Sequence, residues 1–176
     1  MAWCHGAPGI ALSRLRAWEI LRDDVYRCEA EAALGTTAKS LDAPSAPGSG
    51  NFSLCHGQAG NAEALFYASR LLDQGYARPV EGTAERGIQP YQSSRAAWPC
   101  GSNGGGESPN LLLGLAGIGY FYLRLSSPET IPSVLLIQAA MWPRDLREPL
   151  FHQQPIKTPV LADFRHRNLP FLTQLV

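Results

Sequence analysis

The sequence predicts an all-α fold built from helical hairpins and followed by an irregular C-terminal tail. Three Gly-x-x-Gly motifs, beginning at Gly6, Gly57 and Gly114, lie far enough apart for a helical hairpin and its loops between successive copies. Each motif precedes a stretch with apolar residues at helical spacing that ends in Arg-Leu. After Gln138, five prolines interrupt any regular element, so residues 138–176 are expected to be irregular.

Composition and charge set the broad class of the protein. Hydrophobic residues make up 45% of the 176 residues, which favours a folded domain over a disordered one. Basic and acidic residues are balanced at 15 each and no Lys/Arg-rich run stands out, which argues against nucleic acid as the main partner. No apolar run approaches the ~20 residues of a membrane span, and the N-terminus lacks the features of a secretory signal. We therefore expect a cytoplasmic protein whose cysteines stay reduced.

The first two helices follow the first motif. One is predicted over 8–21, with Pro8 in its first turn, where a missing N–H has no helical partner to lose. Its apolar face consists of Ala11, Leu15, Trp18 and Leu21. The next is predicted over 24–41 with Asp24 as the N-cap. Val25, Cys28 and Ala32 lie on one side of it. Residues 42–51 are rich in Pro, Gly and Ser and are expected to form a loop.

Two further helices are predicted after the second and third motifs. The helix over 60–72 aligns Leu65, Ala68 and Leu72. Residues 75–97 are weakly patterned and are expected to hold one short helix at most, and 98–110 form an irregular glycine-rich loop. The helix over 116–125 aligns Ile118, Tyr122 and Leu125. A short extended segment is expected at 133–137.

The chain contains two near-identical triplets, Cys4-His5-Gly6 and Cys55-His56-Gly57, which hold half of its four cysteines and half of its four histidines. Thiolate and imidazole are the ligands that zinc prefers, and a glycine directly after them lets the backbone turn tightly beside an ion. The triplets therefore suggest a metal bound between them. The alternative is two buried cysteines, each beside a solvent-facing histidine. Cys28 and Cys100 lack this context and are expected to be buried as small hydrophobes.

These motifs resemble the lanthionine synthetase C-like family, and more specifically the C-terminal cyclase domain of bifunctional class II lanthipeptide synthetases. The matching stretches are WCHGAPGI (3–10), SLCHGQAGN (53–61), PNLLLGLAGIGY (109–120) and PSVLL (132–136). The resemblance implies part of an α/α toroid of stacked helical hairpins. It also implies that residues 1–137 form the C-terminal part of a cyclase domain, with 138–176 as an irregular tail of unknown role.

The resemblance implies a zinc ion held by Cys4, Cys55 and His56, with water or a substrate sulfur in the fourth place. His5 would then handle a proton at the site, or else be a loop histidine that faces solvent. The implied reaction forms thioether rings: a cysteine of a dehydrated precursor peptide adds to a dehydroalanine or dehydrobutyrine of the same peptide. A free thiol with a pKa of about 8.5 is mostly protonated at neutral pH, which is why this chemistry needs zinc.

The chain also departs from the family pattern, because the match begins only at the first zinc motif. The upstream part of the toroid, the acid/base Asp and His of the family and the dehydratase half have no counterpart here. We therefore expect an incomplete toroid, a C-terminal fragment that carries the three metal ligands but cyclises weakly or not at all alone. A polypeptide that supplies the missing half is an expected partner. The alternatives are a non-catalytic zinc-binding helical module that acts by association, and a metal-free helical fragment.

Overall fold

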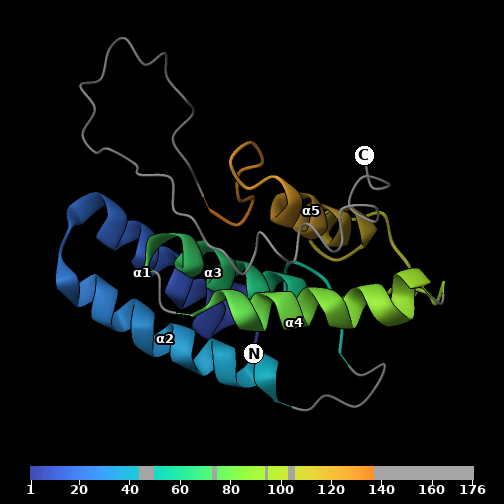
Figure 1. Ribbon diagram of the computed structural model, residues 1–176, viewed down its shortest axis with the longest axis horizontal. Coiled ribbons are helices and arrows are strands. Elements are labelled where there is room, and N and C mark those ends of the chain that lie inside the picture. The colour runs from blue at the N-terminus through green and yellow to red at the C-terminus, as the bar shows by residue number, and fades with distance from the viewer. Residues whose placement is uncertain (44–49, 73–74, 94, 103–105, 137–176) are drawn as a thin grey trace, which may run out of the picture.

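The computed structural model describes residues 1–43, 50–72, 75–93, 95–102 and 106–136. All regular elements within these ranges are helices, which confirms the predicted all-α class (Figure 1). They are the 3-10 helix η1 (Trp3–His5), α1 (Ala7–Leu21), α2 (Asp24–Asp42), α3 (Gln58–Leu71), α4 (Ala77–Gly87), the π-helix η2 (Ile88–Ser93) and α5 (Leu115–Ser126). None of the helices in the described part combines the length and apolarity needed to cross a lipid bilayer.

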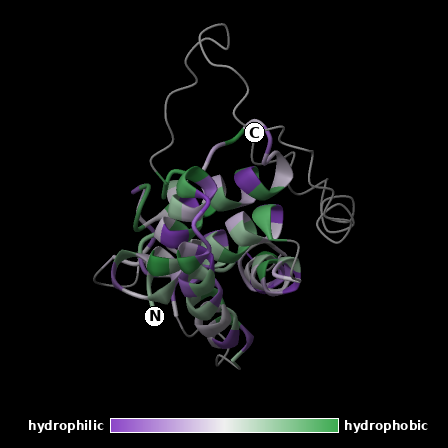
Figure 2. Cartoon of the chain, turned by 90° about the vertical axis from the view of Figure 1, so that its left-hand side faces the viewer, coloured by the Kyte–Doolittle hydropathy of each residue, from purple (hydrophilic) through white to green (hydrophobic). Residues whose placement is uncertain are grey.

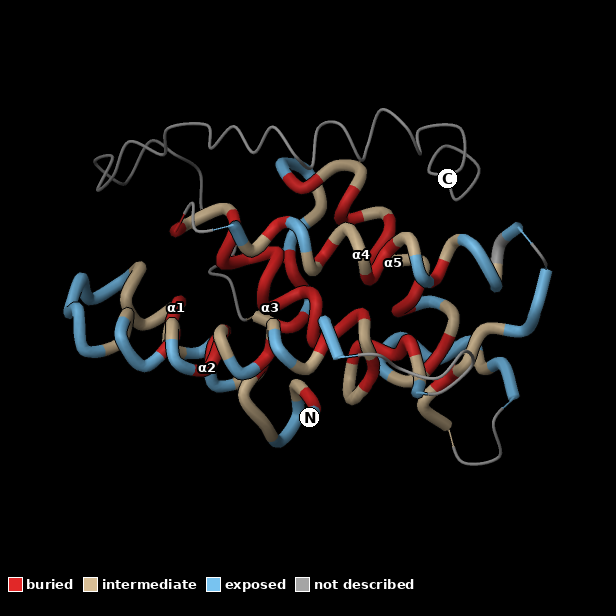
Figure 3. Tube along the Cα trace, turned by 60° about the horizontal axis from the view of Figure 1, so that its bottom comes forward, coloured by how far each residue is buried: buried red, intermediate tan, exposed pale blue. Residues whose placement is uncertain are grey.

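Helix α3 is the centre of the packing. Helices α1 and α2 form a hairpin that packs on it, and α4 and α5 contact it from other sides (Figure 1). Every residue of α3 from Ala59 to Ser69 is buried, which Figure 3 shows as an almost continuous red stretch. In Figure 2, hydrophilic and hydrophobic segments alternate along the helices, as expected for helices that bury one face. The helix that follows the second Cys-His-Gly triplet is therefore fixed on all sides.

The start and the buried face of α2 differ from the prediction. The N-cap is Asp23 rather than Asp24, because the Asp23 carboxylate accepts a hydrogen bond of 3.0 Å from the Val25 backbone N–H. The buried residues of α2 are Ala30, Ala33, Leu34, Thr37 and Leu41. Val25, Cys28 and Ala32 are exposed instead. The buried face combines the small Ala30 and Ala33 with Leu34 and Leu41, and α2 packs against α1 and α3.

The burial predicted for Cys28 and Cys100 and for the apolar face of α1 is confirmed only in part. Cys100 is buried, as predicted, whereas Cys28 is exposed and is not part of the core. In α1, Ala11 and Leu15 are buried as expected, but Leu21 at the end of the helix is 61% exposed. Ile20 in the same turn is also exposed, whereas Trp18 is partly buried against the core.

The weakly patterned stretch after residue 75 is more helical than predicted. Helix α4 has 11 residues and runs on into the π-helix η2. Its buried side consists of Ala77, Val80, Thr83, Ala84 and Gly87, which recur at helical spacing. Most of these residues are small, and Pro79 and Gly82 interrupt the stretch, so the helix is hard to recognise from its sequence. Residues 134–136 form bends, so 133–136 are not a regular extended segment. The predictions for residue 137 and for the tail at 138–176 lie outside the described residues.

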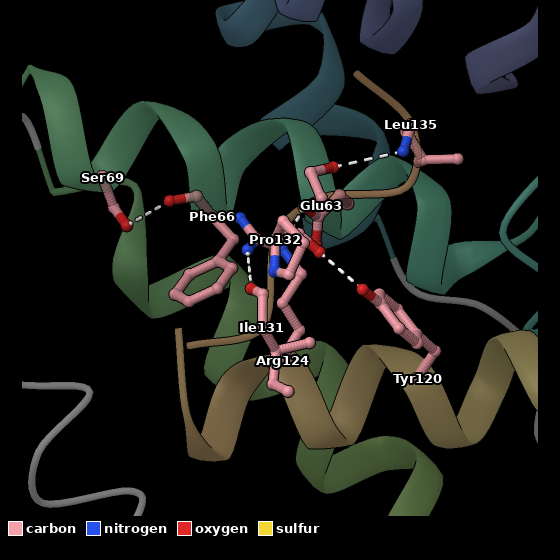
Figure 4. Close-up of polar contacts among 9 residues, drawn as sticks. Glu63, Phe66, Ser69, Tyr120, Arg124, Ile131, Pro132 and Leu135 are labelled. Atoms are coloured by element: carbon pink, nitrogen blue, oxygen red, sulfur yellow. Dashed lines mark hydrogen bonds and ion pairs between the residues drawn. The ribbon is translucent and has the colours of Figure 1, made fainter. Parts of the chain in front are cut away.

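A buried ion pair joins α3 to α5 and to the segment that follows α5 (Figure 4). The Arg124 guanidinium pairs with the Glu63 carboxylate, and their side chains are only 5% and 3% exposed. Arg124 also donates a hydrogen bond of 2.6 Å to the Ile131 carbonyl oxygen. The Tyr120 hydroxyl donates to the Pro132 carbonyl oxygen at 2.8 Å. These contacts hold the segment after α5 against α3.

Replacing Arg124 is expected to destabilise the fold strongly. Arg124→Leu leaves the Glu63 carboxylate buried without its cation, and breaking such a pair costs about 3–5 kcal/mol. The matched control is Arg70→Leu, which removes an ion pair to Glu129, whose side chain is 73% exposed, and should cost less than about 1 kcal/mol. Urea unfolding followed by circular dichroism measures both. Equal losses for the two variants would contradict the buried pair.

Candidate metal centre

The three Gly-x-x-Gly motifs build the same local structure. The turns span residues 3–5, 54–56 and 111–113, and the helices that follow are N-capped by Gly6, Gly57 and Gly114. A Cβ placed on Gly9, Gly60 or Gly117 would overlap the backbone carbonyl oxygen of the residue six positions earlier. The second glycine of each motif therefore lets the turn fold back onto the first turn of its own helix, and no larger residue fits there.

Backbone hydrogen bonds link the three turns side by side at equivalent positions. The Cys4 N–H donates to the Cys55 carbonyl oxygen at 3.3 Å, and the Cys55 N–H donates to the Leu112 carbonyl oxygen at 2.9 Å. The turn that carries Cys55 therefore lies between the other two. In the third turn, Leu112 and Leu113 stand where the first two turns have Cys and His. Only the first two turns contribute thiol and imidazole groups.

The pairing of the first two turns brings three of the predicted ligands together. One ligand atom each from Cys4, Cys55 and His56 lies within 4.8 Å of the other two, and among the described residues this is the group with metal-binding potential. Tetrahedral zinc with bonds of about 2.0–2.3 Å spaces its ligand atoms about 3.5–3.8 Å apart. The ligand atoms therefore lie within about 1 Å of the spacing that zinc requires. Two sulfurs and one imidazole nitrogen also match the donor set of zinc, so the residues present fit this ion.

The surroundings of the thiols favour a cation between them. Burial raises the pKa of the Cys55 thiol, and the hydrogen bond to Cys4 and the negative charge of Cys4 raise it further. Two adjacent thiols cannot both ionise readily unless a positive charge offsets their repulsion. The alternative of two separately buried cysteines is wrong, because Cys4 is exposed, Cys55 is half-buried and their sulfurs converge.

His5 lies at the edge of this group rather than within it. The residue is exposed, and its Nδ1 is 3.0 Å from the Cys4 sulfur. The imidazole is thus accessible to solvent while it contacts one of the converging thiols. His5 thus faces solvent, as one alternative predicts, and also contacts the site, as the other requires. A role for His5 in proton handling stays a prediction.

The support of the second turn was not foreseen from the sequence. The Asn51 side-chain oxygen accepts hydrogen bonds from the Ser53 backbone N–H at 3.0 Å and from the Ser53 hydroxyl at 2.6 Å. The His56 N–H in turn donates to the Ser53 hydroxyl oxygen at 3.4 Å. An Asn two residues before a Ser, directly ahead of the Cys-His pair, is a signal for such a turn. Asn51 and Ser53 thereby fix the backbone that carries Cys55 and His56.

Comparison with known protein families identifies the family of this chain. The model of the family described as lanthionine synthetase C-like protein matches residues 1–136, which include all three motifs and the converging ligands. No solved structure matches the chain at a significant level. The family match covers more than half of the 176 residues. The chain therefore belongs to the lanthionine synthetase C-like family.

Proposed function

We propose that this protein is a zinc-dependent lanthipeptide cyclase, or the part of one that carries the metal centre. Its substrate would be a peptide that contains both a cysteine and a dehydroalanine or dehydrobutyrine. The observation that carries the proposal is the convergence of Cys4, Cys55 and His56 from two separate turns in a chain of this family. That donor set is suited to zinc with one coordination position left open, the arrangement of catalytic rather than structural sites.

In this proposal Cys4, Cys55 and His56 hold the ion. Bound zinc supplies a Lewis acid that keeps a thiol ionised near neutral pH and leaves a fourth position for a substrate sulfur. The protein's own contribution is the rigid spacing of the ligands. The hydrogen bond from the Cys4 N–H to the Cys55 carbonyl fixes the two thiols beside each other, and Ser53 fixes the backbone at His56.

The reaction is an addition that needs no oxidant or reductant. The cysteine sulfur forms a bond to the β-carbon of the dehydro residue as the π bond between its α- and β-carbons breaks. The proton lost from the thiol is balanced by the proton gained at the α-carbon. His5 is the described residue best placed to carry this proton, because its imidazole is exposed and lies 3.0 Å from the Cys4 sulfur.

The scope of the proposal follows the family match. We assign residues 1–137 to the C-terminal part of a cyclase domain of the class II type, and we give no role to 138–176. All three proposed ligands lie within this part. The helices of the described residues do not form a closed toroid. A polypeptide that completes the toroid is therefore the proposed partner. Free thiols at all four cysteines are compatible with a reducing compartment such as the cytoplasm.

One observation favours a second candidate function, a non-catalytic zinc-binding module that acts by association. The α1–α2 hairpin exposes four large apolar side chains, each at least 52% accessible. They are Ile10, Ile20, Leu21 and Val25. Three of them, Ile20, Leu21 and Val25, lie at the junction of α1 and α2. A cluster of exposed apolar side chains is typical of a surface that another polypeptide covers.

The two functions are separated by measuring zinc and thioether formation on the same preparation. The purified full chain is expected to hold about one zinc per molecule and to cyclise a pre-dehydrated cysteine peptide slowly. Because cyclisation leaves the peptide mass unchanged, its progress is measured as loss of the thiol that an alkylating reagent can label. We expect chelation of zinc to stop the loss. Zinc binding without any cyclisation would favour the association module, and absence of zinc would contradict both.

A further inference from the structure

The glycine-rich stretch after η2 contacts the candidate metal centre, although its sequence suggests only an irregular loop. A Cβ placed on Gly101 would lie 2.8 Å from His56 Nε2, 3.0 Å from His56 Cε1 and 2.7 Å from the Ser53 hydroxyl oxygen. Real Cβ atoms are almost never found closer than 3.0 Å to such atoms. The Gly101 backbone therefore packs directly on the imidazole, and any larger residue there would displace the ring or the hydroxyl.

Gly101 is held in this place by the turns that build the site. Its N–H donates a hydrogen bond of 2.8 Å to the Leu113 carbonyl oxygen in the third turn. Two residues earlier, the Pro99 carbonyl oxygen accepts a hydrogen bond of 2.8 Å from the Phe52 N–H, just ahead of the second turn. The segment thus joins the second turn to the third and lies against His56 between them.

The other end of the segment is anchored in the core. The Trp98 ring packs against the rings of Phe52, Tyr91 and Tyr122, with centroids 5.5, 4.9 and 5.8 Å away. The Trp98 backbone N–H donates a hydrogen bond of 2.9 Å to the Glu107 carboxylate. The Tyr122 ring is itself buried and spans to α4, where its hydroxyl donates to the Ala84 carbonyl oxygen. A packed aromatic cluster therefore sets where Gly101 lies.

We propose that the segment 98–101 positions the His56 imidazole for metal binding, with Gly101 as the positioning residue and Trp98 as its anchor. The inference rests on the proposed function, because it assumes that His56 is a metal ligand. It adds a fourth loop to the three turns that the motifs identify. Glycine is needed at 101 for space rather than for backbone conformation, because among the described glycines only Gly50 and Gly75 have positive φ.

The test compares Co²⁺ affinity, with Co²⁺ as a coloured substitute for zinc, between Gly101→Ala and Gly106→Ala in the full chain. Both glycines belong to the same stretch, but a Cβ at Gly106 meets nothing within 4 Å. Residues that orient a metal ligand typically contribute 10–100-fold to affinity, so we expect about that loss for Gly101→Ala. Gly106→Ala should bind as the unchanged protein does. We also expect the visible absorption of bound Co²⁺ to change only in Gly101→Ala, because the imidazole is reoriented.

Two further variants keep the inference open to refutation. In Ser53→Ala the hydroxyl that a Cβ at position 101 would meet is absent. If adding Gly101→Ala to Ser53→Ala still lowers the Co²⁺ affinity, the loss acts through His56. If circular dichroism shows that Gly101→Ala does not fold, Trp98→Leu loosens the anchor without adding atoms beside the ring and should still weaken Co²⁺ binding. Equal affinities in the folded variants and the unchanged protein would overturn the positioning role. Failure of the unchanged protein to bind Co²⁺ would instead overturn the metal centre itself.

Discussion

Cys55→Ser is expected to abolish tight zinc binding, with an affinity at least about 100-fold below that of the unchanged protein. Residues that only orient a metal ligand typically contribute about 10–100-fold to affinity. The loss for Cys55→Ser should be larger, because the substitution removes a ligand that binds the zinc directly. Cys55 also lies in the turn that hydrogen bonds to both neighbouring turns, so no other thiol can take its place without moving the backbone. Competition with a chromophoric chelator measures the affinity, and elemental analysis of the purified protein measures the zinc content.

The matched control is Cys28→Ser. Cys28 is also a free cysteine, but it is exposed on α2 and is not part of the three-ligand group. Its replacement should leave zinc content and affinity unchanged. If both serine variants lose zinc equally, or if Cys55→Ser retains it, the ion does not lie between the first two turns. Cys4→Ser is expected to behave as Cys55→Ser does, since the two sulfurs converge on one point.

Gly60→Ala is expected to destabilise the protein by more than about 3 kcal/mol, at the upper end of the cost of overpacking. On helix propensity alone the substitution would stabilise α3 by roughly 1 kcal/mol. The added Cβ, however, would overlap the Leu54 carbonyl oxygen, and α3 is buried on all sides and cannot shift away. The same overlap would push the turn with Cys55 off the helix, so the variant should also bind zinc weakly.

Gly119→Ala provides the control with the opposite sign. Gly119 lies inside α5, where a Cβ meets nothing within 4 Å. We expect this variant to be more stable than the unchanged protein by about 0.5–1 kcal/mol, because alanine loses less backbone entropy than glycine on folding. Urea unfolding measures the free energy of unfolding of both variants. Similar stabilities for Gly60→Ala and Gly119→Ala would show that the turn does not pack on the helix as described.

The helices that follow the glycine motifs were the most predictable part of the fold. The predicted bounds of α1 and α5 differ from the observed ones by at most one residue at each end, and α3 begins two residues earlier than expected. Their predictability has a local cause. A glycine turn, a helix start and a run of apolar residues at helical spacing are all properties of a short stretch of chain.

The face of α2 and the length of α4 were predicted less well. Apolar residues stand on two sides of α2. The side with Val25 and Cys28 is exposed, and the side with Ala30 and Leu34 is the one that is buried. Which side of a weakly amphipathic helix is buried depends on how closely its neighbours can approach. In α4, small residues such as Ala84 and Gly87 leave room for Tyr122 and Phe52 and give little hydrophobic signal of their own.

The sequence by itself determined that the protein is helical, that it belongs to this family and that Cys4, Cys55 and His56 are its candidate ligands, because these features depend on residue identity and local spacing. Only the tertiary structure decided that the two Cys-His turns lie side by side, that His5 stays at the edge and that Gly101 packs on the His56 ring. Contacts between segments that are distant along the chain depend on the packing of whole helices around α3, and no local pattern encodes that packing.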